Sequence, residues 1–157
     1  MARTNDIAAN PTTEYVTVTI GDHMFGLPIC RVQDVFVPDR LTRVPLAPPE
    51  VAGILNLRGR VVTAIDMRSR LDLGARSPGT QVMAIGIELK GEFYGLLVDS
   101  VGEVLQLRNA ACEANPANLD AGLSRVAAGI YRLEGQLMVV LDVDRVLDIQ
   151  NGAAVAA

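Results

Sequence analysis

The feature that most constrains how this chain can fold is an internal duplication. Residues 53–73 and 129–149 align without a gap, and most matched positions keep their apolar character. A weaker match aligns residues 25–35 with residues 94–104. Identical pairs in the stronger match include Gly53 and Gly129, Ile54 and Ile130, Leu57 and Leu133, Gly59 and Gly135, and Asp66 and Asp142. The sequence therefore predicts two copies of one structural unit.

Short apolar or alternating runs, separated by Gly, Asp and Pro, dominate each copy and predict about five strands. Strands this short are stable only when wrapped into sandwiches or barrels, so we expect two small antiparallel barrels packed together. Asp66 and Asp142 can each cap a short helix, over residues 67–71 and 143–147. We expect the barrels at about 15–80 and 81–149, with flexible tails at 1–13 and 150–157. Terminal elements that cross between the halves remain possible.

The composition excludes several classes of function. Of the 157 residues, half are hydrophobic, which is ample for a core, and the net charge is -4. A nucleic-acid binder usually has a basic face, and an anionic membrane surface attracts basic segments. The sequence shows no apolar signal segment and no run long enough to cross a bilayer. We therefore expect a cytoplasmic protein without nucleic-acid binding or direct membrane insertion.

Few residues are available for catalysis or metal binding. Cys30 and Cys112 have no metal-ligand spacing, and two reduced thiols are the favoured interpretation, with a disulfide left open. His23 is the only histidine, and no third group suggests itself to complete a nucleophile–base arrangement. Phosphate-binding glycine loops and an EF-hand pattern are also missing from the sequence. We expect no enzyme activity, no cofactor and no metal site.

The duplication separates residues that the fold needs from residues that are free to bind. Gly59 and Gly135 match, which indicates a turn with positive φ. Arg58 is matched by Glu134, so the turn tolerates opposite charges there. The planar guanidinium of Arg58 suits bidentate contact with carboxylates or carbonyls. A solvated arginine at a hairpin tip is the competing interpretation.

Four segments, together covering about residues 14–149, resemble the CheW family. The most specific is Gly53-Ile54-Leu55-Asn56-Leu57-Arg58-Gly59, which runs on to residues 65–68; the others lie at residues 14–35, 42–45 and 94–142. The resemblance implies two intertwined, SH3-like five-stranded barrels and a non-enzymatic adaptor of bacterial chemotaxis. Such an adaptor couples methyl-accepting chemoreceptors, through their cytoplasmic tips, to the regulatory domain of the histidine kinase CheA.

The same resemblance implies roles for individual residues. Val16 and Ile29 are candidates for the kinase contact. The receptor-binding candidates are Val32, Asp34, Asn56 and Arg58, with Asn56 and Gly53 supporting the hairpin that carries Arg58. Phe36 and Val37 depart from the charged or glycine residues common in the family, and this apolar pair could shift partner preference.

Three other functions stay open. The first is a CheW-like scaffold of a non-flagellar chemosensory system, such as surface motility. The second is an enzyme or small-ligand binder that uses a barrel cleft, which the shortage of titratable groups disfavours. The third is self-association through sheet edges or through Phe36 and Val37.

Overall fold

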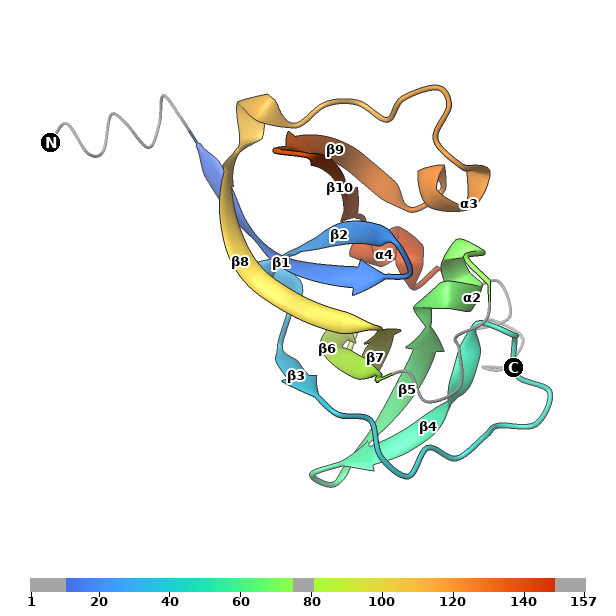
Figure 1. The fold of residues 1–157 in the computed structure, drawn as a ribbon. Coiled ribbons are helices and arrows are strands. Elements are labelled where there is room, and N and C mark those ends of the chain that lie inside the picture. The colour runs from blue at the N-terminus through green and yellow to red at the C-terminus, as the bar shows by residue number, and fades with distance from the viewer. Residues whose placement is uncertain (1–10, 75–80, 149–157) are drawn as a thin grey trace, which may run out of the picture.

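The computed structural model describes residues 11–74 and 81–148, which form two five-stranded sheets and a few short helices (Figure 1). One sheet has the strand order β8-β1-β2-β10-β9, with bounds Ser100–Arg108, Thr12–Ile20, His23–Pro28, Gln136–Leu141 and Ala127–Leu133. The other has the order β3-β6-β7-β5-β4, with bounds Asp34–Phe36, Met83–Leu89, Glu92–Val98, Arg60–Asp66 and Val51–Leu57. The prediction of a mainly β protein with two five-stranded units and short helices is confirmed.

The two sheets exchange strands between the two sequence copies. β1 and β2 join β8, β9 and β10, whereas β3, β4 and β5 join β6 and β7. Each sheet therefore draws on both sides of the boundary expected at residue 80, and the sheets divide the chain differently from the sequential halves. Replacing every strand of one sheet by its repeat counterpart gives the strand order of the other, so the duplication is also a structural symmetry.

One strand pair in each sheet runs parallel, and the other pairs among the described strands are antiparallel. The parallel pairs are β2 with β10, where Phe25 lies beside Val139, and β7 with β5, where Tyr94 lies beside Thr63. These residues are repeat counterparts, so the two pairings share one register. Parallel neighbours are possible here because the paired strands come from different copies and no tight turn joins them.

The local predictions agree with the structure. The hairpins β4–β5, β6–β7 and β9–β10 close at the expected glycine turns. Helix α2 spans Met67–Leu71 and α4 spans Val143–Val146, close to the expected ranges. The side chains of Asp66 and Asp142 accept hydrogen bonds from the backbone N–H groups of Arg68 and Arg145. Both carboxylates therefore cap helices, as predicted.

Three segments differ from the sequence-based expectation. Residues 31–37 have an alternating, strand-like sequence but form only β3, because Ile29–Arg31 forms a turn of 3-10 helix where the chain crosses from one sheet to the other. β1 begins at Thr12, before the expected domain start, because β8 extends to Arg108 and pairs with it. Helix α3 (Ala121–Ser124) is a short helix that the two expected helix caps did not indicate. The predictions for residues 1–10 and 150–157 lie outside the described residues.

A single large apolar core fills the contact between the two sheets. It contains Phe25 and Ile20 of one sheet and Ile85 and Leu96 of the other, all fully buried. Helices α2 and α4 add buried residues to the same core. Each sheet also encloses a smaller cluster of its own. The contact between the units is therefore apolar, as their small size predicts.

Matched glycines allow a chain segment to cross closely over each hairpin. A Cβ atom on Gly53 would lie 2.4 Å from the carbonyl oxygen of Thr42, and one on Gly129 would lie 2.9 Å from that of Glu113. Thr42 and Glu113 form isolated antiparallel bridges with Ile54 and Ile130. The sequence identity of these glycines therefore reflects the same close approach of backbone in both copies.

Candidate functional site

The β4–β5 hairpin holds Arg58 at its tip. Arg58 and Gly59 both have positive φ, 53° and 84°, which is the conformation of a two-residue turn that matches strand twist. The side-chain oxygen of Asn56 accepts a hydrogen bond of 2.9 Å from the backbone N–H of Gly59. Asn56 therefore stabilises the turn, a supporting role that the family resemblance also implies.

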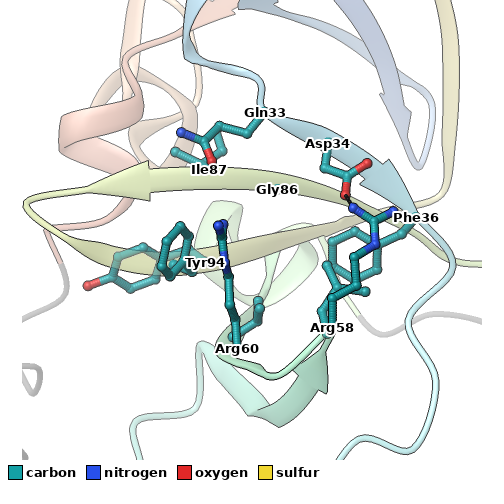
Figure 2. A pocket seen from close by; sticks show the side chains of 11 residues that line it. Gln33, Asp34, Phe36, Arg58, Arg60, Gly86, Ile87 and Tyr94 are labelled. Atoms are coloured by element: carbon teal, nitrogen blue, oxygen red, sulfur yellow. Dashed lines mark ion pairs between the residues drawn. The ribbon is translucent and has the colours of Figure 1, made fainter.

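Arg58 and Asp34, two of the predicted receptor-binding residues, form an ion pair (Figure 2). The Nη1 atom of Arg58 lies 3.2 Å from Oδ2 of Asp34, and the side chains are 77% and 31% exposed. The other oxygen of Asp34 accepts from the backbone N–H of Val35 at 2.9 Å. An exposed pair of this kind adds at most about 1 kcal/mol to stability. Its main effect is to orient a guanidinium that still has free donor positions.

The ion pair lies at the rim of a cleft of about 250 Å³ in the β3-β6-β7-β5-β4 sheet. The guanidinium carbon of Arg60 lies 4.5 Å from the centroid of the Phe93 ring, a cation–π contact. Burial, together with nearby Glu92, raises the pKa of Tyr94 and so favours a neutral phenol. Phe36 and Ile87 supply apolar lining (Figure 2). The cleft thus combines two arginines with apolar and aromatic surface.

The remaining candidates lie elsewhere. Val32 is half-buried and packs against the main core. Val16 is only 6% exposed and belongs to the core, whereas Ile29 is 39% exposed at the start of the 3-10 turn. The structure thus brings Asp34, Asn56 and Arg58 together at one hairpin but does not bring Val16 to the surface. These residue roles remain predictions.

Sequence reasoning missed Arg60 and Phe93 as parts of this surface. A signal was available for Arg60, because its repeat counterpart is Gln136 and the fold therefore does not require an arginine. Of the apolar pair noted in the sequence, Phe36 is half-buried against the small cluster of this sheet, and Val37 is 67% exposed. Only Val37 therefore presents a largely free side chain.

Features of catalytic or metal sites are sparse in residues 11–74 and 81–148. No group of three or more metal-ligating side chains is placed to hold an ion there. Cys30 and Cys112 are free and exposed. His23 lies 6.0 Å from the Phe25 ring and lines neither the cleft above nor a second one beside residues 41–52. Within the same residues, no helix has the length and apolar character of a membrane span.

Comparisons with known proteins agree with this architecture. The family described as the CheW-like domain matches residues 14–151. The chemotaxis protein CheW of Rhizobium meliloti (strain 1021) is 28% identical, over 92% of this chain and 94% of that protein. The chemotaxis protein CheW of Klebsiella aerogenes is 25% identical, over 90% and 86%. The crystal structure of the scaffolding protein TtCheW from Thermoanaerobacter tengcongensis superimposes with a TM-score of 0.78 at 25% identity, covering 88% of this chain and 89% of that one.

Proposed function

The chain belongs to the family of CheW-like domains, and we propose that it is a non-enzymatic adaptor coupling chemoreceptors to the histidine kinase CheA in chemotaxis. Relatives that it matches over most of their length are chemotaxis proteins CheW. A structural neighbour of the same fold is a scaffolding protein. The proposal places the adaptor in the cytoplasm, where receptor tips and kinase are both accessible.

The observation that carries the proposal is the Arg58–Asp34 pair at the hairpin tip. It orients an exposed guanidinium beside apolar surface, an arrangement suited to binding another protein. The second copy keeps the hairpin but has Glu134 in place of Arg58, so the fold does not explain the arginine. We assign the receptor tip to this surface, with Arg58 meeting carboxylate or carbonyl oxygens and Asn56 fixing the turn.

Val32 lies just before β3, the strand that carries Asp34. Because its side chain packs against the core, we assign it a supporting part in the receptor surface. On the kinase side, Ile29 offers exposed apolar surface for the regulatory domain. Val16 is buried, so we assign it an indirect part in supporting the strand rather than a side-chain contact. The kinase and the receptor thereby use different parts of the molecule.

Adaptor function requires that both partners bind at once. Titration calorimetry with a receptor-tip fragment, with the kinase regulatory domain, and with one after saturation by the other tests this directly. We expect both partners to bind, and the second to bind an already occupied adaptor with little loss of affinity. Binding of neither partner, or strict competition between them, contradicts the proposal.

A further inference from the structure

Among the described strands, the chain passes from one sheet to the other at two places. Residues 29–33 lead from β2 to β3, and Asp99 alone leads from β7 to β8 (Figure 1). The β3-β6-β7-β5-β4 sheet is therefore an insertion between β2 and β8, attached through these two crossovers. The sheets share one large apolar core, so we expect movement to be confined to a crossover rather than to involve whole sheets.

The β7–β8 crossover is held firmly. The guanidinium of Arg68 on α2 donates twice to the carboxylate of Asp99, over 3.2 Å from Nε to Oδ1 and 2.6 Å from Nη2 to Oδ2. The same Oδ2 accepts from the backbone N–H of Gly21, in the turn between β1 and β2, at 2.8 Å. The N–H of Asp99 donates to the carbonyl of Thr19 at 3.0 Å. Both charged side chains are only 15% exposed, so dissolved salt screens this pair little.

The β2–β3 crossover begins with a weakly held turn. Ile29–Arg31 forms one turn of 3-10 helix without a buried residue, and the N–H of Val32 closes it by donating to the carbonyl of Ile29 at 3.1 Å. The Nη2 atom of Arg31 lies 3.0 Å from Oδ1 of Asp144 on α4, whose side chain is 65% exposed. A single 3-10 turn and an exposed ion pair each add little to stability.

The far end of this crossover leads directly into the candidate site. Val32 is half-buried against the main core. The N–H of Gln33 donates to the carbonyl of Gly86 in β6 at 2.8 Å, and its side chain donates to Glu88 at 2.9 Å. Asp34 follows as the first residue of β3, a strand of three residues at the edge of its sheet. The position of the carboxylate that pairs with Arg58 therefore depends on how the crossover is held.

We propose that the β2–β3 crossover opens locally while the β7–β8 crossover stays closed, and that the Arg31–Asp144 pair controls the opening. Local opening begins where few apolar groups are buried and backbone hydrogen bonds are exposed, and the two crossovers differ in these respects. A partner bound at Asp34 and Arg58 orders the crossover and so changes how Ile29, at its other end, is presented. This last step rests on the proposed adaptor function.

Amide hydrogen exchange of the full chain, followed by NMR, measures the two crossovers separately. The amides of Val32 and Gln33 report on the first, and those of Gly21 and Asp99 on the second, because each donates one of the hydrogen bonds described above. Relative to intrinsic rates, we expect Val32 and Gln33 to exchange at least about tenfold faster in wild type. Arg31→Met should accelerate these two amides about threefold more and leave the other two unchanged.

Two controls isolate the ion pair. Raising the salt concentration from about 0.05 to about 0.5 M should accelerate Val32 and Gln33 in wild type about twofold, and should have no such effect in Arg31→Met, which lacks the charge. Arg132→Met removes another exposed pair, with Glu113 at 3.0 Å, and should leave all four amides unchanged.

The outcomes are distinguishable. Equal protection of the two crossovers, or equal acceleration of all four amides by Arg31→Met, overturns the local opening, and no acceleration in that variant overturns its control by the pair. A receptor-tip fragment should slow exchange of Val32 and Gln33 at least about twofold, and binding without slowing overturns the coupling. A fragment that does not bind wild type contradicts the adaptor function and the coupling with it, while faster exchange at Val32 and Gln33 in the free protein still confirms local opening.

Discussion

The two hairpins β4–β5 and β9–β10 are copies of one another that serve different ends. Both keep a glycine of positive φ at the turn, 84° at Gly59 and 81° at Gly135. At the tip, however, one has Arg58 and the other Glu134. Because one backbone accepts either charge, the fold does not require an arginine at this position.

The residues beside the tips differ in the same way. Asn56 in the first copy bonds to its own turn, whereas its counterpart Arg132 lies 3.0 Å from Glu113 on the overlying segment. The second hairpin thus uses its arginine within the molecule, while the first directs Arg58 to the rim of a cleft. The comparison teaches that matched residues hold the shared fold, whereas unmatched polar positions are open to different uses in the two copies.

The largest expected effect tests the glycines that permit the close crossing of chain. Gly53→Ala would place a Cβ 2.4 Å from a backbone oxygen at a φ of 154°, and we expect a loss of about 3 kcal/mol in the free energy of unfolding. Gly129→Ala meets a cysteine sulfur at 2.7 Å and a carbonyl at 2.9 Å, and should cost less, about 2 kcal/mol. Urea unfolding measures both. A cost below about 0.5 kcal/mol in either variant contradicts the shared close approach.

The next test compares two ion pairs whose helix residues, Arg68 and Asp144, are repeat counterparts of opposite charge. Arg68 of α2 pairs with Asp99 after β7 at 2.6 Å, and Asp144 of α4 pairs with Arg31 after β2 at 3.0 Å. The first pair is 15% exposed at both side chains, and the second is 30% and 65% exposed.

Arg68→Met should therefore cost about 2 kcal/mol, because it leaves a largely buried carboxylate without its main partner. Arg31→Met should cost under about 1 kcal/mol, as for other exposed pairs. Thermal unfolding of the two variants beside wild type gives the comparison. Equal losses would show that burial does not distinguish the pairs.

A third test compares the small clusters inside the two sheets. In one, Tyr131 lies edge-on to Tyr15 with ring centroids 5.5 Å apart; its counterpart in the other is Leu55. Burial and the bond to Tyr15 raise the pKa of Tyr131 well above its usual value. Above about pH 10 the unfolded chain loses this proton and the folded chain keeps it, so stability should fall by up to about 1.4 kcal/mol per pH unit. Tyr131→Phe should reduce this fall of the unfolding free energy with pH, measured by urea unfolding at pH 9 to 11. An unchanged fall would show that other groups cause it.

Stability effects similar in size to that of the exposed ion pair are expected at the two helix caps. Asp66→Ala and Asp142→Ala each remove one hydrogen bond to a helix N-terminus, with lengths of 3.0 and 3.3 Å. Each should cost about 1 kcal/mol by chemical denaturation. Because both copies use the same cap, a large cost at one site and none at the other would argue against a shared structural role.

The sequence was sufficient for features set by local chemistry. Turn glycines, capping aspartates and alternating apolar residues predicted the hairpins and short helices, because each signal lies within a few residues of its effect. The repeat pattern alone could not predict the exchange of strands, which only the family resemblance implied, since β3 pairs with β6 and β8 with β1 across long separations. A pairing kept within each copy would satisfy the same local pattern.

The candidate site was predictable only in part. Arg58 emerged from the mismatch between the copies, and its ion pair with Asp34 joins residues that the family resemblance had singled out. The cleft with Phe93 was not predictable, because all five strands of its sheet contribute to it. For Val16 the local pattern was the better guide. The alternation of its strand indicates a buried face, and the side chain is buried, whereas the family resemblance implied a kinase contact.

The central claim is that the tip of the first hairpin binds the receptor and that of the second does not. The most direct test measures the affinity of a receptor-tip fragment for wild type, Arg58→Glu and Glu134→Arg, each variant carrying the residue of the other copy. All three should unfold at similar temperatures, because the shared backbone accepts both charges. We predict about tenfold weaker binding for Arg58→Glu and binding within about twofold of wild type for Glu134→Arg. Equal binding by all three proteins, or equal losses in both variants, would contradict the account.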